Sequence, residues 1–228
     1  WNPDDYDEVS SELIGGPVEG SNAGAITYLR IAVRDTDERK VGRAWSNSYT
    51  SIALGSIPGF FGEFPPGPAT PYAVMWPTTV ERSRVAQVVT LDDRTFEVAP
   101  TRVSKRPDPA PLPVPGDIWG GADTVTAPIG SIVGARSGDK AGNANLGVFV
   151  RSAEQYPWLE SFLTVDQLVA ILPDMAPFRI VRHVLPNLMA INFEIFGLLS
   201  DGVSSALRPD PQAKGLSEYF RSVKVPVP

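Results

Sequence analysis

The stretch "PDPAPLPVPGD", residues 107–117, constrains the fold of this chain more than any other feature. Its five prolines fix the backbone torsion φ at alternate positions and have no N–H to donate to a helix or a sheet. A segment of this kind is stiff and extended, so we expect a linker between two folded parts. The chain is therefore divided into residues 1–106, the linker 107–117, and residues 118–228.

Composition limits the class of protein. The 228 residues are 43% hydrophobic and 20% charged, which is enough to bury a core. A net charge of −6 without a basic stripe argues against nucleic acid or an anionic membrane surface as partner. With no cysteine and one histidine, we expect no disulfide, no thiol nucleophile and no metal site. Because no apolar run has transmembrane length and residues 1–15 are polar and acidic, we expect a cytoplasmic protein.

The first part predicts three regular elements. Residues 26–33, "ITYLRIAV", alternate in polarity and predict a half-buried strand. Apolar residues at helical spacing over 41–52 predict a helix, and residues 85–100 predict a hairpin about Asp92–Asp93. Residues 55–77 are too rich in Gly and Pro for a regular element. Their aromatic side chains are expected to pack on a core or on a partner, or to line the pocket of an apolar chain.

The second part mixes strand and helix patterns in an order that predicts an α+β sandwich, with helices on one face of a sheet. Strands are expected at 130–135, 146–150, 178–186 and 188–196, and helices from Glu154, at 164–173 and from Asp210. Between the first two strands lies "ARSGDKAGNANLG", residues 135–147, which concentrates glycines and charged or amide side chains. We expect it to form a loop and take it as the candidate site.

The candidate loop carries residue types suited to an anionic or carbonyl ligand. Its glycines would let successive backbone N–H groups point at an anion. Arg136 offers a two-pronged donor for carboxylate or phosphate, and Lys140 offers a point charge. The amides would hold a thioester or amide carbonyl. The predicted ligand-binding residues are Arg136, Ser137, Gly138, Gly142, Asn143 and Asn145, with Asn192 from the polar face of the strand at 188–196.

Asp139, Lys140 and His183 are the predicted catalytic residues. Asp139 would act as a base or hold Lys140 in place, and His183 carries the side chain best suited to proton transfer near neutral pH. Three other interpretations stay open. Ser137 and Lys140 spell S-x-x-K, an arrangement of some acyl-transfer nucleophiles. The Asp and Asn side chains of the loop would otherwise only cap their own turn. His183, in an apolar strand, also fits a structural role.

Several segments resemble the acyclic terpene utilisation protein A family. In the second part they are "GARSGDKAGNANLGVFVR", "LTVDQLVAILP", "PNLMAINFEIFG" and "DPQAKGLSEYF". The most specific pattern is S-G-D-K-x-G-x-A-N, in which Ala141 stands where a glycine is expected. The resemblance implies a ferredoxin-like α+β domain over residues 118–228. The segments "YLRIAVRDTDERKVGRAW" and "PPGPATPYAVMWPTTV" resemble the closing part of the family's larger N-terminal α/β domain, so residues 1–106 are expected to be a partial α/β segment.

The resemblance also implies a function, the catabolism of branched acyclic terpenes or related acids as coenzyme A thioesters. We expect an enzyme or enzyme subunit with lyase or hydratase chemistry on a hydroxyacyl thioester. Its partner would be a small acyl substrate, and no cofactor is expected. The rival interpretation is a non-catalytic assembly or binding subunit. In both cases we expect either a homo-oligomer or a second chain that carries the family's long N-terminal portion.

Overall fold

The computed structural model describes residues 2–16, 20–55, 57–62, 67–99 and 124–228. The predicted proline-rich linker, residues 107–117, lies outside the described residues, and the domain boundaries on either side of it stay a prediction. No described sheet combines strands from before residue 100 with strands from after residue 123.

A long antiparallel hairpin follows a short 3-10 turn at Pro3–Asp5. It pairs β1 (Glu8–Gly15) with β2 (Thr27–Arg34), which confirms the strand predicted at 26–33. The strand is half-buried, as predicted, over only part of its length. Val33 is half-buried, whereas Leu29 is 56% exposed.

The predicted helix after β2 is present but interrupted. The segment Lys40–Ala44 is kinked at Gly42, whose φ of −86° and ψ of −133° are not helical, and it leads into α1 (Trp45–Thr50) and a 3-10 turn, Ala53–Gly55. Asp37 stabilises the start of this helical segment, because its carboxylate accepts hydrogen bonds from the backbone N–H and the guanidinium of Arg39. Among the described residues of α1, only Ser46 is buried.

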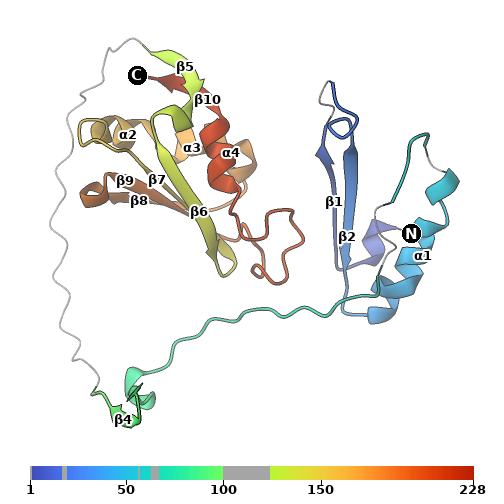
Figure 1. The fold of residues 1–228 in the computed structure, drawn as a ribbon, viewed down its shortest axis with the longest axis horizontal. Coiled ribbons are helices and arrows are strands. Elements are labelled where there is room, and N and C mark those ends of the chain that lie inside the picture. Colours follow the sequence, from blue (N-terminus) through green and yellow to red (C-terminus); the bar gives the residue numbers. More distant parts are fainter. Residues whose placement is uncertain (1, 17–19, 56, 63–66, 100–123) are drawn as a thin grey trace.

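Residues 67–81 contain no helix or strand and run as an extended segment (Figure 1). Trp76 is 87% exposed, so its side chain does not pack on a core of described residues. Tyr72 lies against Arg34, whose guanidinium carbon is 5.2 Å from the ring centroid. Packing of the aromatic residues on a partner stays a prediction.

The hairpin predicted about Asp92–Asp93 is confirmed. After a 3-10 turn at Arg82–Arg84, β3 (Val88–Leu91) pairs with β4 (Arg94–Glu97). Asp92 adopts a φ of 53° at the turn, a conformation that Asp tolerates better than most residues. The side chains of both strands are exposed.

A four-stranded antiparallel sheet forms the centre of the second part (Figure 1). Its spatial order is β6-β7-β9-β8, so that β6 and β8 are the two edge strands. The strands are β6 (Gly134–Lys140), β7 (Asn143–Phe149), β8 (Ile180–Leu185) and β9 (Ala190–Ile195).

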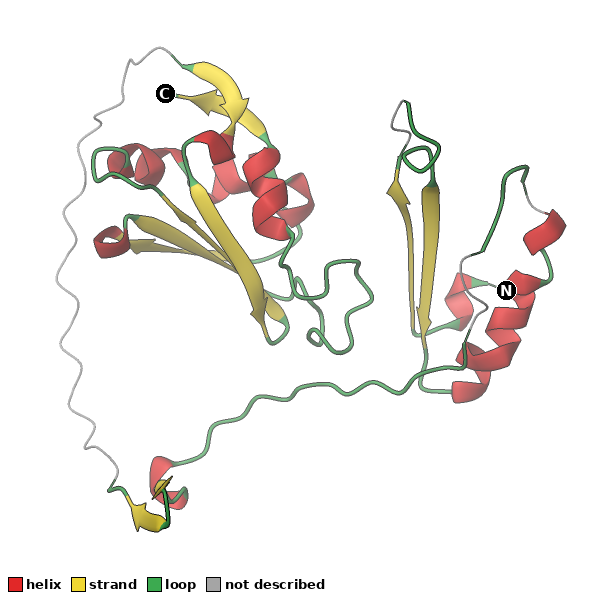
Figure 2. Ribbon diagram, in the orientation of Figure 1, coloured by secondary structure: helices red, strands yellow, loops and turns green. Residues whose placement is uncertain are grey.

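Three helices cover one face of this sheet (Figure 2), which confirms the α+β sandwich. They are α2 (Tyr156–Phe162), α3 (Val165–Ile171) and α4 (Leu216–Ser222). The predicted cap of α3 is present, since the Thr164 hydroxyl accepts from the Gln167 N–H at 3.1 Å. The core between the layers includes the fully buried Leu146, Phe193 and Phe220. The opposite face of the sheet has no described helix over it.

Short elements complete the second part. β5 (Val125–Pro128) pairs with β10 (Lys224–Val227) in a separate two-stranded sheet. Single 3-10 turns lie at Ile129–Ser131, Pro173–Met175 and Pro186–Leu188.

Two arginines of β2 connect the N-terminal hairpin to the loop that follows β9. Arg30 donates to the carbonyl oxygen of Leu207 at 2.6 Å, and Arg34 donates to that of Ser205 at 3.1 Å. Arg34 also lies 3.6 Å from the carboxylate of Asp201. These contacts fix the hairpin beside the end of the sheet where β6 turns into β7.

Candidate functional site

The candidate stretch is a hairpin rather than a loop. Residues 134–140 and 143–149 pair along their whole length, from Gly134 opposite Phe149 to Lys140 opposite Asn143. Only Ala141 and Gly142 remain in the turn, and Ala141 adopts a φ of 54°. The predicted cradle of successive N–H groups is therefore wrong, because the hydrogen-bonding groups of extended strands point alternately to opposite sides.

Ser137 lies on the helix-facing side of β6 and is buried. Its hydroxyl donates to the carbonyl oxygen of Ala213 at 2.6 Å and accepts from the Ser217 N–H at 2.9 Å. The extended strand also separates Ser137 from Lys140, whose positions differ by an odd number and therefore lie on opposite faces. This geometry gives no support to an S-x-x-K nucleophile, so we leave Ser137 out of the proposed site.

The open face of the sheet brings together several of the predicted residues. Register places Arg136, Gly147, Asn192 and His183 in one row across the four strands. The neighbouring row holds Gly138, Asn145 and Glu194. The Asn145 amide donates to the Asn192 carboxamide oxygen at 3.1 Å.

Asn143 and His183 are both linked to Glu194 on this face. The Asn143 amide donates to Glu194 at 3.1 Å, and the Asn143 oxygen accepts from the Gly197 N–H at 3.0 Å. Nε2 of His183 lies 3.9 Å from the other carboxylate oxygen of Glu194. Because the Asn143 amide and carbonyl are both used within the fold, this residue positions the β6–β7 hairpin against the chain after β9.

Because Gly138 has no side chain, the ammonium of Lys214 can lie beside it, and the sequence did not predict this cation. A Cβ added at Gly138 would lie 3.2 Å from Nζ of Lys214 and 3.8 Å from Oδ1 of Asn145. Lys214 belongs to the segment before α4, and β6, which carries Gly138, is an edge strand of the sheet. The Asp210 carboxylate fixes that segment by accepting from the backbone N–H groups of Lys214 and Gly215, both at 2.8 Å.

Asp139 and Lys140 do not form an ion pair. The Lys140 ammonium instead donates to the backbone carbonyl oxygen of Asp139 at 2.9 Å. Register places Asp139 opposite Ala144, on the side of the sheet that carries the core. The structure therefore separates the three predicted catalytic residues: Lys140 and His183 lie on the open face in different strands, and Asp139 lies on the opposite side of β6.

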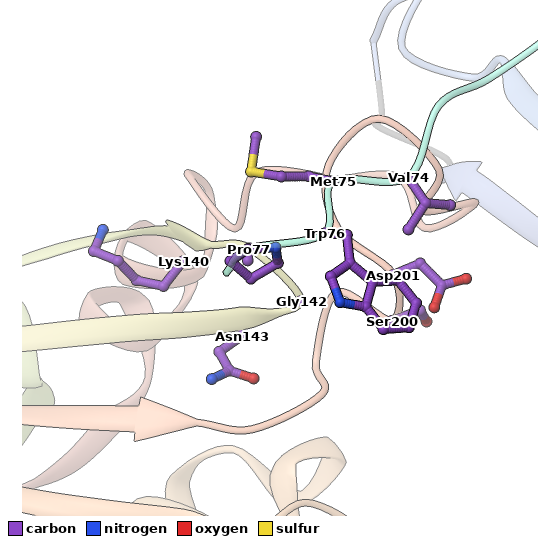
Figure 3. Close-up of a pocket in the computed structure, with 10 residues that line it drawn as sticks. Val74, Met75, Trp76, Pro77, Lys140, Gly142, Asn143, Ser200 and Asp201 are labelled. Atoms are coloured by element: carbon purple, nitrogen blue, oxygen red, sulfur yellow. The ribbon is translucent and has the colours of Figure 1, made fainter. Parts of the chain in front are cut away.

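A pocket of about 320 Å³ lies at the β6–β7 turn (Figure 3). One wall is the extended segment Val74–Pro77, and the other is Lys140–Asn143 together with Ser200 and Asp201. Figure 3 shows the Trp76 indole beside Ser200 and Asp201, and the Lys140 side chain extending away from them along β6. The pocket thus joins a largely apolar wall to one with polar and charged groups.

Gly142 fixes the floor of this pocket. A Cβ added at Gly142 would lie 2.3 Å from the carbonyl oxygen of Ser200, so only glycine allows this close approach. The Leu199 N–H donates to the Gly142 carbonyl oxygen at 3.0 Å. Asp201 had no sequence signal of its own, because it comes from an irregular segment whose position depends on these contacts.

Among the residues that the structure describes, no helix is long and apolar enough to cross a membrane. Within the same ranges, no group of three or more Asp, Glu or His side chains is arranged to hold a metal ion.

Two family matches account for most of the chain. Residues 127–226 match the AtuA ferredoxin-like domain, and residues 1–91 match the acyclic terpene utilisation family protein AtuA. No curated protein and no solved structure gives a significant match to the chain.

Proposed function

The chain belongs to the AtuA family of acyclic terpene utilisation proteins, and from this premise we propose that it binds a branched acyl or hydroxyacyl group in the pocket at the β6–β7 turn. Family membership suggests a role in acyclic terpene utilisation. The observation that carries the proposal is the pairing of the apolar wall at Val74–Pro77 with the charged groups of Lys140 and Asp201.

The apolar wall matches the chemistry of an acyclic terpene chain. Val74, Met75 and Trp76 are 46%, 65% and 87% exposed, so a bound hydrocarbon chain would remove a large apolar area from water. Each Å² of apolar area buried in this way contributes about 25 cal/mol. An exposed tryptophan next to a cavity is a typical anchor for such a group.

The charged wall matches the functional end of the same ligand. The Lys140 ammonium would turn from the Asp139 carbonyl oxygen toward the pocket and donate to a carboxylate or thioester carbonyl, and the Asp201 carboxylate would accept from a hydroxyl group. A cation at a carbonyl and a carboxylate at a neighbouring hydroxyl are the groups that lyase or hydratase chemistry on a hydroxyacyl thioester requires. We therefore propose Lys140 and Asp201 as the reacting groups, in an enzyme or enzyme subunit without a bound cofactor.

Two matched valines test the binding step. Val74 lines the pocket and Val89 lies on the separate β3–β4 hairpin, with similar exposures of 46% and 41%. We expect citronellic acid, an acyclic terpene acid, and its coenzyme A thioester to change the tryptophan fluorescence of the chain. Trp76→Phe should remove this ligand-induced change. Val74→Ser should weaken this binding severalfold and Val89→Ser should leave it unchanged. Equal effects of the two valine substitutions would contradict the pocket.

A second candidate function, a non-catalytic assembly subunit, is favoured by the exposed apolar side chains of the N-terminal hairpin. Leu13 pairs with Leu29 and Ile14 pairs with Tyr28, and all four are 40% exposed or more. Neighbouring pairs point to opposite faces of a two-stranded sheet, so both faces carry exposed apolar groups. Two-stranded hairpins are marginally stable alone, which favours a covering chain.

Native mass spectrometry of the protein purified from its own cells separates the two candidates. A second chain in fixed stoichiometry, or a homo-oligomer that Leu29→Ser dissociates, would favour the assembly function. Turnover of a hydroxyacyl thioester that Lys140→Gln and Asp201→Asn each abolish would favour the enzyme. If the chain binds the acyl thioester without turnover, both by itself and in the assembled complex, the enzyme function is excluded and a binding role remains.

A further inference from the structure

We propose that the edge of β6 holds a phosphate-binding site made by Lys214, Lys140 and Arg136 around Gly138. It shares Lys140 with the acyl pocket, but Lys214, Arg136 and Gly138 do not line that pocket, and the site does not depend on the function proposed there. The three cations come from two segments far apart in the sequence, and the fold brings them to one stretch of one strand.

Two ammonium groups lie beside consecutive residues of β6. Nζ of Lys214 is 3.2 Å from the position that a Cβ would take on Gly138, and Nζ of Lys140 is 2.9 Å from the carbonyl oxygen of Asp139. Arg136 is two residues before Gly138 on the same face of the strand and is exposed. Its long side chain can therefore reach the space above Gly138.

The charges of these three cations are not neutralised by the fold. Among the described residues, no carboxylate forms an ion pair with any of them, and the side chains of Lys214 and Arg136 have no hydrogen-bond partner. Like charges held close together repel one another, so a bound anion would stabilise this arrangement.

The nearby carboxylates are committed elsewhere. The Asp210 carboxylate accepts from two backbone N–H groups at 2.8 Å. Glu194 is bound to Asn143 and lies 3.9 Å from His183. Asp139 lies on the opposite side of the strand. The cations therefore face solvent as a group, and in a chain of net charge −6 they form a local positive surface.

The number of cations indicates the class of anion. A monocarboxylate carries one charge and satisfies one cation, whereas a phosphate group carries close to two charges and offers three acceptor oxygens. The guanidinium of an arginine together with two lysine ammonium groups therefore matches the charge and the acceptor oxygens of a phosphate group. The phosphate would belong either to free inorganic phosphate species or to a nucleotide, and both share this recognition chemistry.

Gly138 is the residue that makes the site specific. Any side chain at this position would meet the Lys214 ammonium, and because that ammonium is the far end of a flexible chain, it would be displaced rather than the strand. Gly138→Ala is therefore expected to preserve the fold while moving a cation out of the site.

Calorimetric titration of the full chain at low ionic strength, with pyrophosphate, ADP and acetate as probes, tests the proposal. We expect one pyrophosphate or ADP site and weaker or no acetate binding. Lys214→Gln should weaken phosphate binding about tenfold or more, which is the usual effect of losing one charge-assisted contact. Gly138→Ala and Arg136→Gln should weaken phosphate binding as well.

Lys224→Gln, which replaces an exposed lysine on β10, is the matched control and should have no effect.

Each outcome bears on the proposal. Tighter binding of ADP than of pyrophosphate would assign the site to a nucleotide, and equal binding would assign it to a free phosphate group. Absence of pyrophosphate binding, acetate binding of equal strength, or an equal effect of Lys224→Gln would overturn the site. Because pyrophosphate has no acyl chain, Trp76→Phe should not change its binding, so failure of the acyl pocket and failure of this site are distinguishable.

Discussion

The hydroxyl of Ser137 accepts a hydrogen bond from the backbone N–H of Ser217 at 2.9 Å. This bond attaches the first turn of α4 to the edge strand β6, across a buried contact between residues eighty positions apart in the chain. The same hydroxyl donates to the Ala213 carbonyl oxygen, so one small side chain satisfies two backbone groups. The segment that carries Lys214 is thereby held against β6.

Removal of this hydroxyl should destabilise the domain. In Ser137→Ala both backbone groups lose their partner in a buried setting, and such a loss costs about 1–3 kcal/mol. We expect the urea midpoint of the full chain to fall accordingly. Ser222→Ala is the control, because the Ser222 hydroxyl donates to the Tyr219 carbonyl oxygen at an exposed site. An unchanged midpoint for Ser137→Ala would contradict the structural role given to it.

The β6–β7 turn should not tolerate a larger residue at Gly142. The added methyl group of Gly142→Ala would lie 2.3 Å from the Ser200 carbonyl oxygen, which is backbone and cannot move alone. Overpacking of this kind costs about 1–3 kcal/mol, so the thermal midpoint should fall, and acyl binding should weaken with it. Gly62→Ala adds the same methyl group where no atom lies within 4 Å and should change neither quantity.

Titration of Asp37 should report the ion pair that begins the helical segment before α1. Hydrogen bonds from Arg39 lower the pKa of this carboxyl from 3.8 to about 2. Because the folded pKa is depressed, the stabilisation is present above pH 3.8 and is lost as the pH falls toward 2. Carboxyl carbon chemical shifts should show this low midpoint. In Arg39→Gln the midpoint should move back toward 3.8, and a midpoint that stays near 2 would contradict the assignment of its cause.

The elements with strong periodicity could be predicted from the sequence. The strand at 188–196 places Ile191 and Phe193 in the core and Asn192 on the other face, as its alternation indicates. The cap of α3 at Thr164 follows from a local hydrogen bond between residues three apart. Such features depend on neighbours in the chain and need no knowledge of the tertiary fold.

The candidate stretch could not be predicted in the same way. Glycines and polar residues in "ARSGDKAGNANLG" are typical of a loop, yet the hairpin forms because Ala135, Ala144 and Leu146 reach the core and polar residues occupy the open face. The Ser137 hydroxyl, which is buried, forms its hydrogen bonds with backbone groups of Ala213 and Ser217, far away in the sequence. The position of Lys214 likewise depends on a long-range contact with Gly138, which no local pattern contains.

The hairpin β1–β2 should loosen when Arg34 is removed. The Arg34 side chain is 17% exposed and contacts Glu8 at 2.5 Å, Asp201 at 3.6 Å and the Ser205 carbonyl oxygen at 3.1 Å. Arg34→Met keeps much of the chain length but leaves these acceptors without their cation, so amide hydrogen exchange should accelerate in residues 27–34 and around Asp201. Because Asp201 lines the acyl pocket, acyl binding should weaken as well. Arg39→Met removes an arginine whose side chain is 90% exposed and, within the described part of the chain, forms its ion pair and hydrogen bonds with Asp37, so it should leave exchange at both places unchanged. Faster exchange in β2 alone would show that the hairpin and the pocket loop are not coupled through Arg34.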